Sequence, residues 1–562
     1  MSTFELESFD LGVLASKLIQ YAEHKPTLYR ASVNRIHELE GSERLEVPHD
    51  RLVEVLTEAT IDPEVAFELS TVTAKATGDS ELPVEILSSL AEEALKTRGY
   101  GALRQIDAIL TYATLNQVYR FVYSGPRSRA LGNQVRVRAR AALRSAAAAE
   151  LSAAMSRCPP VVSDNDEELR VLMAVAWVPA RPDSGAHLRQ ISNYANAILA
   201  AAADRGQTCS IKVIFTFDHS IIKLWRNFQA DNPNTRKVID EALTSRLPSG
   251  CEGRLSVDFH NPSAFSDFGD YLDSVAGCIA AFNPSCVMKW YGFYQSIYFA
   301  SGLFEHFPVI GLQFNAGNPI DMHADLLLAQ GDTRSKALDL VGGNRWRDHV
   351  IPLDVFERRE ILTRADAQMG KDDVVMVSAM TGGRLDQAIA ELTADEARDL
   401  SELFERHPNL HWHLVAAQDP DRIKQCRPEL AMPMNQGRIH FVPLLPDLRA
   451  YIAIADLYLQ LPGMRGGGMS AAMAVVEDKP LIAFSGTDPC NFLPDETIFD
   501  AWPDYVSTLS KCLTDPQFSE NFARQQRRYL TECHSSKVVG RSLLAHIAEA
   551  TEIAKIRRFQ ML

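Results

Sequence analysis

The sequence lacks the cysteine patterns and the long apolar runs that mark several classes of protein. Its nine cysteines are scattered over 562 residues with no Cys-x-x-Cys pair, which fits reduced thiols better than a disulfide framework or a zinc site. No apolar run approaches the roughly 20 residues that a membrane helix needs. The opening stretch MSTFELESFDLG is acidic and lacks the basic and apolar regions of a secretion signal. We therefore expect a soluble, cytoplasmic protein with no transmembrane segment.

The sequence also contains fewer positively charged than negatively charged residues. The formal net charge is -15, which argues against nucleic acid or an anionic membrane as a partner over most of the surface. A local basic pocket for a phosphate is compatible with this balance. The composition, 46% hydrophobic and 23% charged, is that of an ordinary folded protein, and the length indicates about three domains.

Residues 1–157 are predicted to form an all-helical domain. Apolar residues recur there at the i, i+3, i+4 and i+7 spacing of an amphipathic helix. Pro63 and Pro83 fall near predicted helix starts. The stretch 135–157 is rich in alanine and arginine, which favours a helix. No internal repeat stands out, although paired helices could still stack as a solenoid.

After a linker at 158–168, apolar runs of strand length alternate with helices. This alternation predicts parallel sheets covered on both faces. One series spans 168–360, a second spans 370–540, and a helix at 541–562 follows. The expected fold class is α/β, with two doubly wound Rossmann-like domains preceded by the all-α domain. Ligands of such sheets bind beyond the carboxyl ends of the strands, so we expect a site in the cleft between the two domains.

The stretch LPGMRGGGMSAAMAVVEDKPLIAF, residues 461–484, places three glycines between an apolar strand and a run of helix-forming residues. Gly466, Gly467 and Gly468 are therefore predicted to lie in a strand-to-helix turn, with Ser470 at or near the N-cap. A helix N-terminus offers unpaired N–H groups to a phosphate, and Arg465 could add a charge-assisted contact. The alternative is a tight turn with a solvated arginine, since a short glycine-rich run is a weak motif.

A second glycine-rich stretch, TGGRLDQ at 381–387, follows the first strand of the same predicted domain and is interpreted as a loop. An ordinary loop arginine is the alternative to a functional Arg384. Two such loops at strand ends of one sheet together predict a clamp for a diphosphate. The residues predicted to bind the donor nucleotide are Gly383, Arg384, Arg465, Gly466, Gly467, Gly468, Met469 and Ser470.

The first α/β domain carries a candidate catalytic base. Ser184 and Gly185 precede a predicted helix whose first turn contains His187, and a histidine there can take a proton from an acceptor group. A partly exposed histidine at a helix start, without catalytic role, is the alternative. His219 and Lys289 follow or end predicted strands, which would direct them toward the same cleft.

The order of these parts resembles a GT-B glycosyltransferase. The resemblance covers roughly 168–550 and rests on 177–199, 374–387 and above all 438–484, with its pattern GGG-S-AA…KP-I. It implies that a nucleoside-diphosphate sugar, a UDP-sugar in the first instance, binds mainly to the C-terminal domain. It implies further that Arg384 and the Gly466–Ser470 loop hold the diphosphate. No metal and no other cofactor would be needed, because arginines and helix dipoles neutralise the leaving group.

One departure from that family concerns two glutamates, eight positions apart, which many retaining members carry around this loop. The matching positions here are Arg465 and Met473, and Glu477 lies one turn further on. The resemblance therefore does not imply a retaining mechanism, and the ribose would be recognised elsewhere.

The helical extension resembles that of cytoplasmic bacterial protein glycosyltransferases, which makes a polypeptide acceptor plausible by architecture alone. Alternatively, the helices bind a partner or build a homo-oligomer. The predicted function is glycosyl transfer to a protein or glycan acceptor, with His187 as the base. Two other interpretations remain: a nucleotide-sugar epimerase of the same fold, and a non-catalytic GT-B-like binding or partner subunit.

Overall fold

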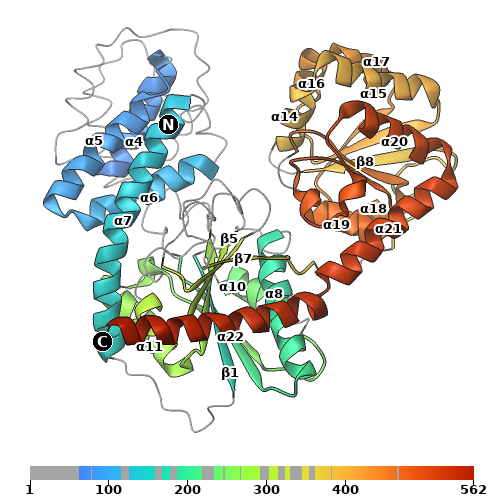
Figure 1. Cartoon of the computed structure of the whole chain (residues 1–562). Helices are drawn as coiled ribbons and strands as arrows, with labels where there is room; N and C mark the ends of the chain where they lie inside the picture. The colour runs from blue at the N-terminus through green and yellow to red at the C-terminus, as the bar shows by residue number, and fades with distance from the viewer. Residues whose placement is uncertain are drawn as a thin grey trace.

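The structure is a computed structural model (Figure 1). It describes residues 62–77, 79–115, 126–157, 168–176, 186–217, 233–244, 247–265, 268–291, 303–313, 323–329, 345–353, 361–380, 383–464 and 468–561. The helices predicted before residue 62 and the linker at 158–167 lie outside these ranges.

The described part of the N-terminal region, within 62–157, is helical. Its helices pack on one another as a bundle: α4 (Pro63–Thr77), α5 (Leu82–Thr97), α6 (Tyr100–Leu115) and α7 (Pro126–Arg157). Pro63 and Pro83 occupy the first turns of α4 and α5, where a missing N–H costs no helical hydrogen bond. Inside the bundle, Arg140 Nε lies 2.6 Å from Asp107 Oδ1, and both side chains are buried.

The first α/β domain contains a seven-stranded sheet in which the paired strands are all parallel. Its strands, in the spatial order β3-β2-β1-β4-β5-β6-β7, are β3 (Leu255–Phe259), β2 (Cys209–Phe215), β1 (Leu169–Val175), β4 (Cys286–Tyr291), β5 (Val309–Gln313), β6 (Leu326–Ala329) and β7 (Trp346–Asp348). The principal helices are α8 (Ala186–Asp204), α10 (Pro233–Thr244) and α11 (Phe268–Phe282). The first six strands follow the common Rossmann order 3-2-1-4-5-6.

The second α/β domain repeats that order in a six-stranded parallel sheet, β10-β9-β8-β11-β12-β13. The strands are β10 (Ile439–Val442), β9 (Leu410–Val415), β8 (Val374–Ala379), β11 (Leu457–Gln460), β12 (Leu481–Phe484) and β13 (Ile498–Phe499). The helices are α14 (Arg384–Glu391), α15 (Ala394–Arg406), α16 (Pro420–Cys426), α17 (Ala431–Asn435), α18 (Leu448–Ile454), α19 (Gly468–Val476), α20 (Trp502–Thr514) and α21 (Pro516–His534). The predicted fold class, two doubly wound domains behind a helical region, is confirmed.

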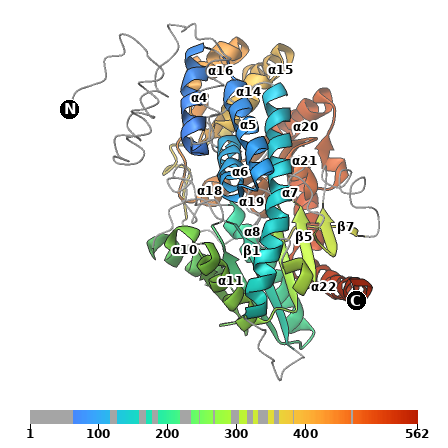
Figure 2. The ribbon, with the colours of Figure 1, turned by 90° about the vertical axis from the view of Figure 1, so that its left-hand side faces the viewer.

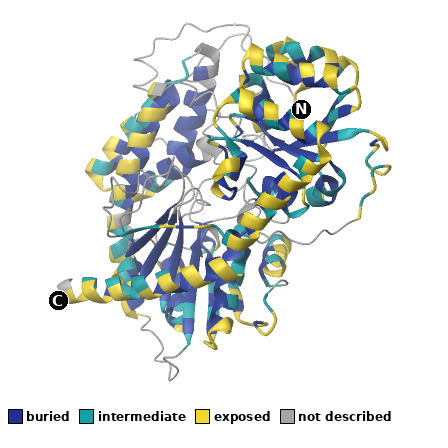
Figure 3. Ribbon diagram, turned by 45° about the vertical axis from the view of Figure 1, so that its right-hand side comes forward, coloured by how far each residue is buried: buried dark blue, intermediate teal, exposed yellow. Residues whose placement is uncertain are grey.

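Apolar side chains account for this layering. The strands of both sheets are largely buried, and the covering helices expose only their outer faces (Figure 3). One continuous core joins the helical bundle to the first sheet, with α7 running down from the bundle to pack on α11 (Figure 2). The helical region is thus built onto the first α/β domain.

The last helix, α22 (Ser536–Met561), leaves the second domain and packs along α8 and against β5 and β6 of the first (Figure 1). The predicted helix at 541–562 forms most of it. A Cβ at Gly540 would lie 2.0 Å from Ala197 O, so the crossing of α22 over α8 requires glycine at this position. Among the helices in the described ranges, none has both the length and the apolar character needed to span a bilayer.

The chain between the two α/β domains is held from both sides. Asn193 of α8 donates to Pro352 O (3.2 Å), and His534, the last residue of α21, accepts at its backbone oxygen from Leu353 N (2.9 Å). The His534 ring also contacts Ile351 O (3.0 Å between Nδ1 and O). The outgoing segment 351–353 and the return of the chain at 534–536 therefore lie side by side.

Candidate functional site

The two glycine-rich stretches follow neighbouring strands of the second sheet. β8 pairs with β9 on one side and with β11 on the other, and the strand order reverses between β8 and β11. Ligands of open α/β sheets bind at such a switch point, beyond the carboxyl ends of the strands. The structure therefore brings together the starting points of both predicted donor loops, which are far apart in the sequence.

The stretch after β8 is shorter than the loop predicted at 381–387. Helix α14 already begins at Arg384, and its N-cap Gly383 has the left-handed φ of 66°, which glycine adopts without strain. Leu385 and Ile389 are buried on the inner face of α14, and their burial favours a helix that begins directly after the turn. Arg384 is exposed in its first turn, directly after the carboxyl end of β8.

A buried carboxylate fixes α14 in place. Asp386 is 2% exposed, and its Oδ1 accepts hydrogen bonds from the backbone N–H groups of Gln418 (3.0 Å) and Asp419 (2.9 Å). Those residues follow β9, the next strand of the sheet. The orientation of the α14 N-terminus is thus tied to the neighbouring strand end.

The loop after β11 leads into α19, which begins at Gly468. Ser470 lies in the first turn of this helix, two residues after its start, rather than at the N-cap. Met469 is half-buried beside it. Arg465, Gly466 and Gly467 lie outside the described residues, so their part in the site stays a prediction.

Tyr458 of β11 connects the end of β8 to the first turn of α19. Its buried hydroxyl accepts a hydrogen bond from Ala379 N (3.1 Å) and lies 3.0 Å from Ala379 O and 2.9 Å from Ser470 Oγ. Burial raises the pKa of Tyr458 to about 12, so the phenol keeps its proton at neutral pH. The end of β8 and the first turn of α19 are therefore held in one hydrogen-bonded group (Ala379, Tyr458 and Ser470).

Asp488 was not predicted from the sequence, but it borders the start of α19. A Cβ at Gly468 would lie 3.1 Å from Asp488 Cβ and 3.6 Å from its Oδ2. Asp488 is exposed and follows β12, the strand beside β11. The only sequence signal for it is an acidic turn, SGTDPCN, after an apolar strand.

The structure also places the two residues at which the sequence departs from the retaining pattern. Met473 is 6% exposed and belongs to the apolar core on one face of the second sheet. Glu477 forms an ion pair with Arg449 of α18, 2.5 Å between Oε1 and Nε, and both side chains are largely buried. Neither position presents an uncommitted carboxylate to a ligand.

The predicted residues of the first domain are placed less completely. Ser184, Gly185 and His219 lie outside the described residues, and so does the side chain of His187, whose backbone is in the first turn of α8. Helix α8 follows β1, which adjoins β4 at the switch point of the first sheet. Lys289 of β4 is 2% exposed and donates from Nζ to His323 O (2.7 Å), so at least one of its contacts is structural.

No protein-family model and no curated protein matches the sequence. Among solved structures, the chain is similar to HepE of Anabaena in complex with UDP and glucose, with 13% identity, 68% of this chain and 99% of HepE covered, and a TM-score of 0.46. It is similar to a mutant O-GlcNAc transferase of Thermobaculum terrenum, with 12% identity, coverage of 91% and 100%, and a TM-score of 0.48. A putative UDP-N-acetylglucosamine 2-epimerase from Listeria monocytogenes gives 11% identity, coverage of 68% and 97%, and a TM-score of 0.42.

At 11 to 13% identity these are likenesses in the path of the chain. The topology itself, two sheets of Rossmann order in tandem, is that of the GT-B fold predicted from the sequence.

Proposed function

We propose that this protein is a glycosyltransferase that moves a sugar from a nucleoside-diphosphate sugar, UDP-sugars being the first choice, to a protein or glycan acceptor. One observation carries the proposal. Two glycine-rich, arginine-bearing connections start from adjacent strands, β8 and β11, at the switch point of a sheet of Rossmann order.

The diphosphate binds between the N-termini of α14 and α19. Each helix end contributes unpaired N–H groups and a partial positive charge, typically about 0.3–1 kcal/mol per end for a nearby anion. Arg384 lies in the first turn of α14, and Arg465 precedes the glycines that lead into α19. A charge-assisted hydrogen bond contributes about 1.5–3 kcal/mol, so the arginines supply the larger share. Gly466, Gly467 and Gly468, with Met469 and Ser470, complete the anion site.

The hydroxyl groups of the donor need a carboxylate or an amide partner. Met473 is in the core and Glu477 is paired with Arg449. Asp488, exposed beside Gly468, is the residue that we assign to the ribose or hexose hydroxyls. A carboxylate there would accept hydrogen bonds from a diol next to the diphosphate.

The first domain presents the acceptor. His187 acts as general base from the start of α8, with Ser184, Gly185, His219 and Lys289 on the same side of the cleft. Closure of the domains excludes the water that would otherwise hydrolyse the donor. Because the helical bundle shares one core with this domain, it moves with the acceptor site, and this supports a role in binding a polypeptide acceptor. Dimer formation through the bundle is the alternative.

The test is calorimetric titration with a panel of nucleoside diphosphates, followed by transfer and hydrolysis assays with the matching nucleotide sugars. Arg384→Ala and Arg465→Ala should each weaken nucleotide binding by about 10- to 100-fold, the equivalent of one lost charge-assisted contact. Arg398→Ala, on the exposed face of α15, is the matched control and should bind as the wild type does. If neither loop arginine matters, the diphosphate clamp is wrong.

The core position of Met473 favours one alternative, a GT-B-like subunit without catalytic activity, because the carboxylate of the retaining pattern is missing there. Such a subunit need not bind nucleoside diphosphates at all, so the titration separates it from a transferase. Turnover of the donor in the absence of any acceptor would instead indicate a nucleotide-sugar epimerase.

A further inference from the structure

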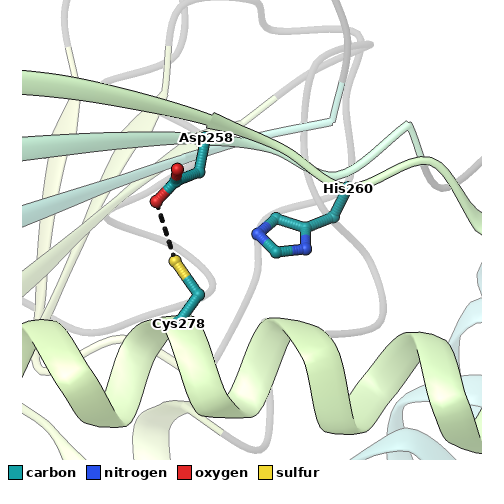
Figure 4. A group of neighbouring side chains, drawn as sticks. All are labelled: Asp258, His260 and Cys278. Carbon is teal, nitrogen blue, oxygen red and sulfur yellow. Dashed lines mark hydrogen bonds between the residues drawn. The ribbon is translucent and has the colours of Figure 1, made fainter.

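Among the described residues, one group of three potential metal-ligating side chains lies close together, and it is in the first α/β domain, not at the proposed donor site. Asp258 lies in β3 at the edge of the sheet, His260 follows the end of that strand, and Cys278 lies on α11. Their ligand atoms are all within 4.8 Å of one another. The three side chains face a common space between the strand and the helix (Figure 4).

The histidine is oriented as a metal ligand would be. Its Nδ1 lies 3.2 Å from Ser274 Oγ, one turn before Cys278 on α11. The other ring nitrogen, Nε2, is buried and has no hydrogen-bond partner among the described residues, and the ring points toward Asp258 and Cys278 (Figure 4). A buried nitrogen without a partner is costly, and a hydrogen bond to the second ring nitrogen is what holds metal-ligating histidines in place.

The donor set has a chemical preference. A thiolate, an imidazole and a carboxylate are the three ligand types that Zn²⁺ takes, at about 2.3 Å from sulfur and about 2.0–2.2 Å from nitrogen or oxygen. Magnesium and calcium take oxygen ligands and would leave the sulfur unused. At present Cys278 Sγ donates to Asp258 Oδ2 (3.0 Å), so the two groups are already adjacent.

A lysine competes for the same carboxylate. Lys212 Nζ of β2 lies 2.6 Å from Asp258 Oδ2 and 3.8 Å from Cys278 Sγ. Arg236 of α10 adds a second positive charge nearby, over the Phe259 ring at 5.4 Å. The Lys212 ammonium offsets the charge of the Asp258 carboxylate, and Arg236 is a further positive charge that disfavours a cation. The side chains of Lys212 and Asp258 are 18% and 38% exposed, so an ion can enter from solvent and the ammonium can move out.

We propose that Asp258, His260 and Cys278 form a binding site for one thiophilic divalent metal ion, with Zn²⁺ as the ion used to test it. Three protein ligands and one water complete a tetrahedral site. Cys278 binds as the thiolate and its proton passes to solvent, while Lys212 leaves Asp258 Oδ2. The bound ion would fasten the end of edge strand β3 to α11, which packs on α7 of the helical bundle.

The experiment uses the full-length protein freed of metal by a chelator and then dialysed. Titration with Co²⁺ should produce a thiolate-to-cobalt charge-transfer band that saturates at one equivalent, and Zn²⁺ should displace the cobalt. Cys278→Ser should abolish the band, whereas Cys426→Ser, a matched cysteine on α16 of the other domain, should leave it unchanged. Ser274→Ala keeps all three ligands and should weaken Zn²⁺ binding by about tenfold with the band retained.

Lys212→Met is the sharpest variant, because it removes the competing charge and keeps the length of the aliphatic side chain. A unit charge about 4 Å away strongly disfavours a cation, so this change should tighten Zn²⁺ binding by at least tenfold. Circular dichroism and thermal unfolding of each variant show whether it folds. The proposal is overturned if neither the wild type nor Lys212→Met gives the cobalt–thiolate band, or if the band survives in Cys278→Ser.

Discussion

Replacing Tyr458 by Phe removes the single hydroxyl that holds together the bases of both proposed donor loops. The hydroxyl accepts from Ala379 N and contacts Ala379 O and Ser470 Oγ at 2.9 to 3.1 Å. In the variant, Ser470 Oγ can still donate to Ala379 O, because these two oxygen atoms are 3.3 Å apart. Ala379 N–H loses its partner inside the domain, which costs about 1–3 kcal/mol.

This loss should be measurable in two ways. For a domain of this size, 1 kcal/mol corresponds to roughly 2–4 °C in Tm, so the unfolding transition of the second domain should fall by about 2–12 °C in scanning calorimetry. Binding of a nucleoside diphosphate should weaken as well, because the N-terminus of α19 is no longer held against the end of β8. A misalignment worth about 1 kcal/mol would raise Kd roughly fivefold in titration calorimetry.

Tyr271→Phe provides the matched control. Its hydroxyl is equally buried and donates to Thr216 O (2.7 Å) in the first domain, so that variant should lose stability without any change in nucleotide affinity. If Tyr458→Phe loses stability as expected but binds the nucleotide like the wild type, the hydroxyl does not position the donor site. If its stability is unchanged, Ala379 N–H is satisfied in some other way and the magnitude above is wrong.

Two further predictions concern histidines of the first domain. His187→Ala should reduce the transfer rate by about 10²–10⁴-fold with nucleotide affinity unchanged, because the proposed donor site is in the other domain; an unaltered rate would remove His187 as the base. Burial, with His546 and His534 nearby, lowers the pKa of His349 to about 3. A histidine whose pKa is depressed on folding stabilises the protein above its unfolded pKa of about 6.5 and loses that contribution as the pH falls toward 3. The depressed pKa of His349 alone should therefore lower the free energy of unfolding by about 1.4 kcal/mol as the pH falls from roughly 7.5 to 5.5. In denaturant titrations of the His349→Gln variant, this dependence of the free energy of unfolding on pH should be smaller.

Much of the fold could be predicted from local patterns. Apolar runs such as 374–379 and 457–460 became buried strands, because a strand covered on both faces needs apolar residues at nearly every position. The boundary after β8 was predicted less well, since Gly383 ends the turn earlier than its composition suggested. The return of α22 to the first domain was not predicted. It depends on Gly540, whose lack of a side chain lets the helix meet Ala197, and an isolated glycine does not reveal its contact.

The candidate site, like the fold, could be predicted only in part from the sequence. Glycines and arginines at strand ends led to the prediction of a phosphate site, because the chemistry of those residues is local, and that site stays a prediction. Asp488 and Tyr458 escaped prediction, since their positions beside the proposed site come from strands that are neighbours only in the folded sheet. The cysteine pattern likewise gave no sign of a metal site, because Cys278 lies 20 positions from Asp258 and meets it only across β3 and α11.

Local sequence patterns were enough to indicate the two α/β series and the residue types available at each strand end, because burial and backbone freedom leave local patterns. Which strand ends become neighbours follows from the folded arrangement of the chain. This arrangement placed β8 beside β11, joined Ala379 to Ser470 through Tyr458, and brought Asp258, His260 and Cys278 together. Such contacts follow from the order of strands in a sheet and from helix packing, which no stretch of sequence encodes on its own.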